Sequence, residues 1–244
     1  MKNNGVLIVA VGCMVLSGGC KNGQGTGAIK GKGPTGKQAS GGKVTKLNNA
    51  SRATITGVVM NVETEKPLSG VTVVQRKATT LVKAVTGAGG TFTLVTKGGS
   101  AAYVEAKKAG MISTLKLSAK FGSANLELFP AAFLDKLYAA AGLPKRDASR
   151  GAVMVVFPEK LSSRVGATLS AGHGGSFTVG DDDKPVKSSK LIPGGISMLF
   201  FVNVAPGSTE VKLSGGGCKL TPPSIKQYKV VAGTLTEIEV SCRK

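Results

Sequence analysis

The side chains of this chain that could carry out catalysis or bind a metal do not form a recognisable site. His173, the single histidine, lies among glycines in Ser170–Gly175, and no G-x-S-x-G motif accompanies it, so we expect a loop residue rather than the base of a triad. Ser113 and Lys116 match S-x-x-K, but that motif opens a helix in Ser–Lys enzymes and here lies in an expected strand. Asp181–Asp183 lacks the spaced oxygen ligands of a calcium loop. We therefore predict no catalytic residue, no metal and no cofactor.

The four cysteines are the remaining reactive side chains, and their positions divide them into two pairs. Cys13 and Cys20 lie in or just after an apolar N-terminal run, whereas Cys218 and Cys242 lie near the C-terminus. An even pair in an exported chain predicts a disulfide between Cys218 and Cys242. It would close a loop of about 25 residues and stabilise the fold by about 3 kcal/mol. Metal binding by two cysteines without a nearby histidine is the poorer alternative.

Residues 1–19 have the layout of a secretory signal, with a charged start, the apolar run Gly5–Leu16 and small residues at the end. The apolar part would span about 22 Å as a helix, short of the roughly 30 Å hydrocarbon core, which favours a signal over a membrane helix. Because Cys20 follows the small residues directly, the segment resembles a bacterial lipoprotein signal. The resemblance implies cleavage before Cys20 and a lipid on its thiol. The segment departs from the family at Ser17, where the family usually has leucine. Cys13 is a competing candidate for the lipidated cysteine.

The charge balance is strongly basic, with 32 Lys and Arg against 13 Asp and Glu and a net charge of +19. Residues 20–52 form a Gly- and Lys-rich segment in which six lysines and one arginine occur without any acid. Such a segment cannot offset its ordering entropy, so we expect a disordered, lipid-anchored linker. It either holds the folded part off the membrane or also contacts an anionic surface, such as lipid headgroups or an acidic polysaccharide. An exported protein rarely meets nucleic acid, so we expect no such partner.

Residues 53–130 alternate with period two, the signature of strands. The expected strands include Ile55–Val59, Leu68–Val73 and Tyr103–Ala106, and Thr86–Leu94 reads as strand, glycine turn and strand. The order I-x-G-x-V, P-L-S-G-V-T-V, G-G-T-F-T-L and Y-V-E-A-K-K-A-G resembles the carboxypeptidase regulatory-like domain. That resemblance implies a transthyretin-like β-sandwich of about seven strands that is not itself catalytic. Two features depart from the family. Gly87 and Gly89 stand where the family usually has an aspartate, and Met111 replaces an aromatic residue.

Residues 131–244 are predicted to hold a connector helix and a second β-sandwich-like domain. Apolar residues recur at helical spacing over residues 130–144, between Pro130 and Pro144. Strands follow at Ala152–Phe157, Met198–Val204 and Gly233–Val240, among others. Together these patterns predict an all-β fold of two small sandwiches joined by a short helix. The likeness of Val165–Leu169 to Ser69–Val73 hints at a repeat, and it could equally arise by chance.

Three functions follow from different readings of these features. The first is a non-catalytic lipoprotein of the bacterial cell envelope that acts as a structural or interaction module on a lipid tether. The second is a binding module for an anionic envelope polymer or polysaccharide, which the charge favours and the absence of Trp disfavours. The third is an accessory protein of an envelope hydrolase. We predict the first, facing the periplasm or the exterior, with an unidentified protein partner.

Overall fold

Strands dominate the described part of the chain, and one short helix interrupts them midway. The computed structural model describes residues 52–76, 81–97, 102–118, 122–158, 165–215 and 217–242. The strands of the first half are β1 (Arg52–Asn61), β2 (Thr72–Arg76), β3 (Leu81–Val85), β4 (Thr91–Lys97), β5 (Ala102–Lys107), β6 (Met111–Ser118), β7 (Gly122–Ser123) and β8 (Leu126–Pro130). Helix α1 (Ala131–Ala140) is followed by β9 (Gly151–Val156), β10 (Gly166–Leu169), β11 (Gly175–Val179), β12 (Pro185–Lys187), β13 (Met198–Val204), β14 (Gly207–Ser214), β15 (Cys218–Thr221), β16 (Gln227–Val230) and β17 (Thr234–Cys242). The all-β prediction is confirmed.

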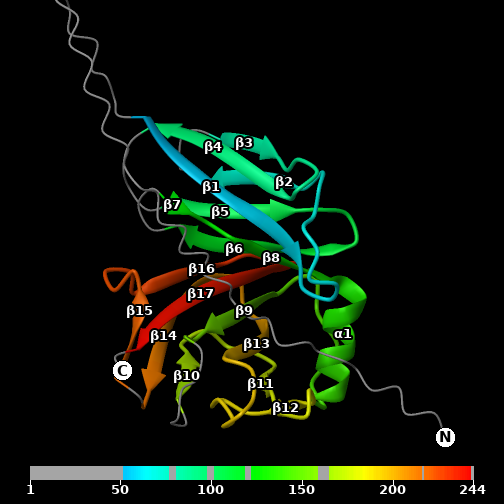
Figure 1. Ribbon diagram of the computed structural model, residues 1–244. Helices are drawn as coiled ribbons and strands as arrows, with labels where there is room; N and C mark the ends of the chain where they lie inside the picture. The colour runs from blue at the N-terminus through cyan, green and yellow to red at the C-terminus, as the bar shows by residue number, and fades with distance from the viewer. Residues whose placement is uncertain are drawn as a thin grey trace, which may run out of the picture. The chain divides into compact units, whose positions relative to one another are not determined.

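The first half is a sandwich of two layers. Strands β3, β2, β5 and β6 hydrogen-bond in that order, and β1 pairs with β4, β7 and β8 to form the facing layer (Figure 1). Alternate side chains of both layers meet in a core of aliphatic residues and one phenylalanine. Gly57 on β1 lies against the backbone of the segment between β7 and β8, where a Cβ would lie 2.2 Å from the carbonyl oxygen of Ala124.

The second expected strand begins later than the alternation suggests. We predicted a strand over Leu68–Val73, whereas β2 starts at Thr72. Gly70 has a φ of 67°, a left-handed conformation that ends extended structure there. The hydroxyl of Thr86 accepts a hydrogen bond from the Val71 N–H at 2.9 Å and so fixes this corner.

The second half consists of a central sheet that is covered on both faces. Strands β12, β11, β13, β9 and β17 pair in that order, and β15 pairs with the far end of β17. Helix α1 packs on one face, and the three-stranded sheet β10–β14–β16 covers the other (Figure 1). Because both faces are covered, β9 and β13 are almost entirely buried, which explains the unbroken apolar run Met198–Val204. The predicted helix is confirmed as α1, which begins after Pro130.

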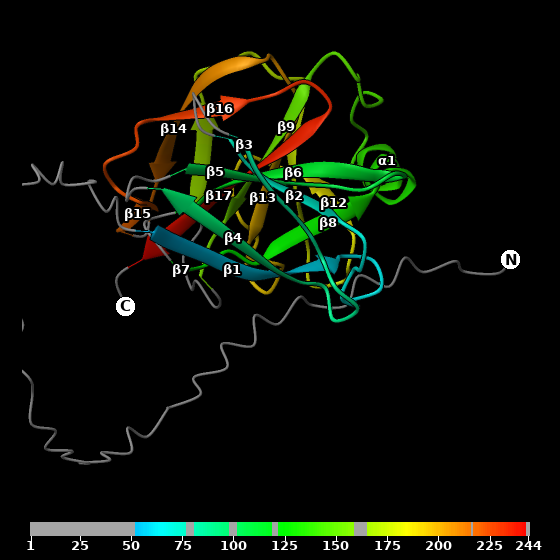
Figure 2. The same cartoon turned by 90° about the horizontal axis from the view of Figure 1, so that it is seen from above.

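One pair of strands joins the two halves. Strand β17, the last in the chain, runs parallel to β9 on one side and to β6 on the other, with Thr234–Glu237 alongside Ser113–Lys116. A single path of nine paired strands therefore runs from β12 to β3 (Figure 1), and Figure 2 shows the molecule from above. All described residues belong to one compact unit. The proposed boundary near residue 130 falls between β8 and α1, and the division into domains 53–130 and 131–244 stays a prediction.

Candidate functional site

A cluster of four ionisable side chains lies at the seam where β6 meets β17. Lys116 on β6 is its centre, with an ammonium group 2.7 Å from a carboxylate oxygen of Glu237 and 2.7 Å from one of Glu239, both on β17. Only 12% of the Lys116 side chain and 6% of the Glu237 side chain are exposed. Glu127, on the neighbouring strand β8, completes this seam cluster of Lys116, Glu127, Glu237 and Glu239.

Hydrogen bonds to the backbone of β8 and the residue before it tie the seam cluster to the first sandwich. The Lys116 ammonium donates to the carbonyl oxygen of Asn125 at 3.2 Å, and the Thr114 hydroxyl donates to the carbonyl oxygen of Glu127 at 2.5 Å. The second carboxylate oxygen of Glu237 is buried and has no partner among the described residues. The Lys116 side chain on β6 therefore contacts both the residue before β8 and the distant strand β17.

The electrostatics of the seam cluster follow from one cation facing three acids. The pKa of Glu127 is raised from 4.5 to about 7, chiefly by burial and also by the nearby Glu237, while Lys116 opposes both effects. Burial likewise raises the pKa of Glu237, again against the attraction of Lys116. For Lys116 itself, burial alone would lower the pKa, but the two β17 carboxylates outweigh it and raise the pKa above its ordinary value. The cluster thus keeps its lysine charged while a carboxyl group exchanges a proton near neutral pH.

The seam cluster was missed by sequence reasoning. Glu237 and Glu239 lie in a strand that alternates cleanly, and that pattern predicts solvated glutamates on one face. Glu237 is instead buried, with Glu127 of β8 close to it, whereas Glu239 two residues further on stays half-exposed. A signal was available only in the second half of S-x-x-K, since Lys116 stands among the apolar residues Leu115 and Leu117.

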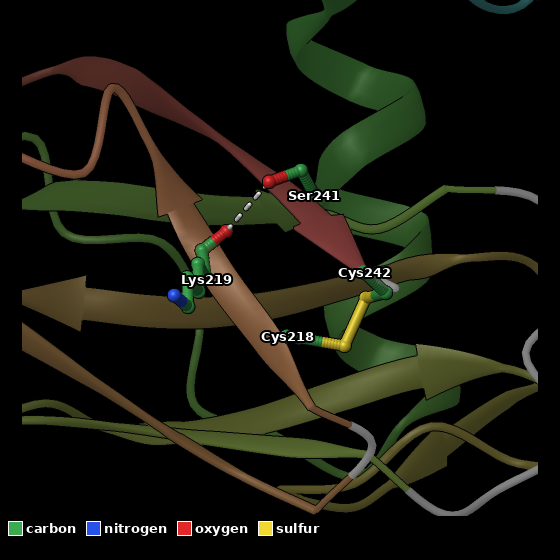
Figure 3. Close-up of a disulfide and its surroundings, with 4 residues drawn as sticks. All are labelled: Cys218, Lys219, Ser241 and Cys242. Carbon is green, nitrogen blue, oxygen red and sulfur yellow. Dashed lines mark hydrogen bonds between the residues drawn. A yellow bond between two sulfur atoms is a disulfide. The ribbon is translucent and has the colours of Figure 1, made fainter. Parts of the chain in front are cut away.

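The predicted disulfide between Cys218 and Cys242 is confirmed. These residues face each other in the antiparallel register of β15 and β17, and their Cα atoms are 4.0 Å apart. Figure 3 shows the bond beside Lys219 and Ser241, where the Ser241 hydroxyl donates to the Lys219 carbonyl oxygen at 3.5 Å. The bond fastens β15 to the last strand of the central sheet.

A shallow groove of about 430 Å³ lies next to the disulfide. Its lining includes apolar residues such as Leu213, Leu220 and Ile225, and the charged residues Lys219, Lys226 and Glu210. These mixed charges favour no particular ligand.

The other candidate side chains have structural roles. The His173 ring packs edge-on against the Phe201 ring, with 5.2 Å between the ring centroids. Its Nδ1 accepts a hydrogen bond from the Gly175 N–H at 3.2 Å. Ser113 lies in β6 rather than at the start of a helix, as expected. Asp181–Asp183 forms the turn between β11 and β12, where Lys184 pairs with the central aspartate, Asp182, at 2.6 Å.

The predicted lipidation site and linker cannot be compared with the structure. Cys20, together with residues 1–51, lies outside the described residues. Within the described ranges, no group of three or more His, Cys, Asp or Glu side chains could hold a metal ion. None of the helices in those ranges has the length and apolarity that a membrane crossing requires.

Comparisons with known proteins were made by sequence and by structure. No family model matches the chain, so its resemblance to the carboxypeptidase regulatory-like domain stays a prediction. No curated protein matches it either.

Solved structures similar to this chain at low identity include two pilin subunits and a further bacterial protein. The TIE protein of Bacillus anthracis is 12% identical with a TM-score of 0.27, over 78% of this chain and 34% of that one. The shaft pilin SpaA of Lactobacillus rhamnosus GG is 9% identical with a TM-score of 0.25, over 80% and 99%. BcpA, the major pilin subunit of Bacillus cereus, is 11% identical with a TM-score of 0.25, over 78% and 69%. This chain spans about a third of the TIE protein's length. Scores this low carry no argument about function, and the all-β assignment rests on the strands themselves.

Proposed function

We propose that this protein is a non-catalytic lipoprotein of the bacterial cell envelope, a structural or interaction module held to a membrane by a lipid on Cys20. The observation that carries the proposal is the disulfide between Cys218 and Cys242. Disulfides persist in oxidising compartments outside the cytosol, which agrees with the export signal in residues 1–19. A module that must keep its shape outside the cell gains from such a cross-link.

The folded part is built in a way that suits a mechanical or binding role. The last strand, β17, lies in the middle of the nine-strand path and is fastened by both the seam cluster and the disulfide. On β17, only two residues separate Glu239 of the seam cluster from Cys242 of the disulfide. The layers of the fold are packed on one another through three hydrophobic cores. This arrangement supports a rigid body displayed on the basic linker.

The lipid attachment is tested by metabolic labelling with an alkyne-bearing palmitate analogue in a bacterial host that processes lipoproteins. We expect the wild-type protein to be labelled and the Cys20→Ser variant to lose its label and leave the membrane fraction. Cys13→Ser is the matched control, because it removes the competing cysteine and should leave the labelling unchanged. Loss of label in Cys13→Ser, or its persistence in Cys20→Ser, would contradict the assignment.

A second candidate function, binding of an anionic envelope polymer, is favoured by the net charge of +19. It is tested by measuring binding of the mature, non-lipidated protein to purified envelope fractions over a range of salt concentrations, with and without residues 21–52. Electrostatic binding through the linker should collapse with salt and vanish with the deletion. Binding that survives both changes would place the contact on the folded part.

A further inference from the structure

The nine-strand path ends at β3, which is an open edge. Strand β3 pairs with β2, and among the described residues no strand pairs with its other side. The opposite end of the path, β12, is protected in a familiar way, since it is three residues long and begins with Pro185. Strand β3 has five residues, Leu-Val-Lys-Ala-Val, without proline, and its even register with β2 shows no bulge. It therefore lacks most of the features that block strand pairing.

The register of β3 identifies which of its backbone groups are free. The N–H of Thr86, just after β3, donates to the carbonyl oxygen of Val71 at 2.9 Å, so the backbone of Thr86 points toward β2. Alternate residues of a paired strand direct their N–H and C=O groups to opposite sides. Leu81, Lys83 and Val85 consequently direct theirs away from β2, toward the open edge.

The same three residues present their side chains to solvent. The exposed fractions of Leu81 and Val85 are 68% and 59%, and Lys83 between them is also exposed. In the described part of the chain, Lys83 has no carboxylate within ion-pair distance. Val74 lies directly opposite Lys83 on β2, and the nearby cation Arg76, opposite Leu81, pairs with Glu105. The edge thus displays an apolar–basic–apolar pattern in which the charge is not compensated.

We propose that the β3 edge binds an extended segment of a partner protein by strand addition, and that this segment carries an acidic side chain flanked at two-residue spacing by apolar ones. The free backbone groups would supply the hydrogen bonds, as in other cases of added strands. Each side chain of the added strand lies directly opposite one on β3, so apolar residues would face Leu81 and Val85, and the acid would face Lys83.

A second copy of this chain fits the edge less well. Antiparallel pairing of β3 with itself about its central residue would place two Lys83 side chains directly opposite each other. Like charges in this position are destabilising, and both chains carry a large excess of positive charge. Charge complementarity therefore favours an acidic partner. This surface would serve the interaction role proposed above. The proposal of strand addition can be refuted without any effect on lipidation at Cys20.

Two synthetic peptides test the proposal, Thr-Val-Thr-Glu-Thr-Val-Thr and its relative with Lys in place of Glu. Binding to the purified protein is measured by fluorescence anisotropy, and the bound site by hydrogen exchange of the backbone amides. We expect the Glu peptide to bind the wild type roughly threefold more tightly than the Lys peptide, and this preference to invert in the Lys83→Glu variant. The backbone amides of residues 81, 83 and 85 should exchange roughly tenfold more slowly when the peptide is bound, because their free N–H groups become hydrogen-bonded to the added strand.

Three results would overturn the proposal. One is equal binding of both peptides by wild type and Lys83→Glu, and another is protection of amides elsewhere but not in β3. The third is protection of β3 by concentrated protein alone or by anionic vesicles when the Glu peptide gives none, since the occupant would then be a second copy or a membrane. Val186→Glu on the opposite edge strand β12 is the matched control and should change neither peptide's affinity. Because the substituted residues, Lys83 and Val186, are both exposed, the variants should fold.

Discussion

Replacement of Glu127 by Gln should change how the stability of the protein depends on pH. The pKa of Glu127 is about 7 in the folded protein and about 4.5 in the unfolded chain, because burial and Glu237 disfavour its charged form. Below pH 4.5 the carboxyl is protonated in both states and costs nothing. Between pH 4.5 and 7 the folded state holds a proton that the unfolded state releases, so stability falls as pH rises. A difference of 2.5 pKa units corresponds to at most about 3 kcal/mol, and the part of this side chain that reaches solvent reduces the effect.

The neutral amide of the Gln variant cannot titrate, so it should lose this part of the pH dependence. We expect wild type and variant to differ little at pH 4, and the variant to be the more stable by about 2 kcal/mol at pH 8. Urea unfolding at several pH values between 4 and 8, followed by circular dichroism with the disulfide intact, measures the difference directly. Glu63→Gln in the exposed turn after β1 is the control and should leave the wild-type curve unchanged. A difference between Glu127→Gln and wild type that is constant with pH, or that grows toward acid, would refute the electrostatic account of the seam cluster.

Three further sets of substitutions test the packing and the cross-links that stabilise the fold. Lys116→Met should lower the free energy of unfolding by about 3–5 kcal/mol because it leaves Glu237 buried without its cation, and adding Glu237→Leu should recover much of the loss in the same urea assay. Replacing both Cys218 and Cys242 by Ser should cost about 3 kcal/mol, and reducing agent should then have no further effect on the melting temperature. Gly57→Ala should cost about 1–3 kcal/mol since its new methyl group would meet the Ala124 carbonyl, whereas the control Gly87→Ala has open space and should change little.

Local patterns were sufficient for most individual elements. The helix over Ala131–Ala140 followed from helical spacing between Pro130 and Gly142, and the run Met198–Val204 identified a buried strand. These predictions succeeded because periodicity and turn residues act over a few positions. The predicted start of β2 was four residues too early. The left-handed conformation of Gly70 and the hydroxyl of Thr86, sixteen positions away, fix the corner that precedes this strand.

The sequence by itself determined the all-β class, the helix at Ala131–Ala140 and the pairing of Cys218 with Cys242, since composition, spacing and cysteine number act without reference to distant strands. Only the tertiary structure decided that β17 inserts between β9 and β6. The parallel pairing of β17 with β6 joins residues more than a hundred positions apart, and no local pattern records it. It also buries Glu237 beside Lys116 and leaves β3 at the open end of the path, so the ionisable seam and the free edge arise from which strands become neighbours.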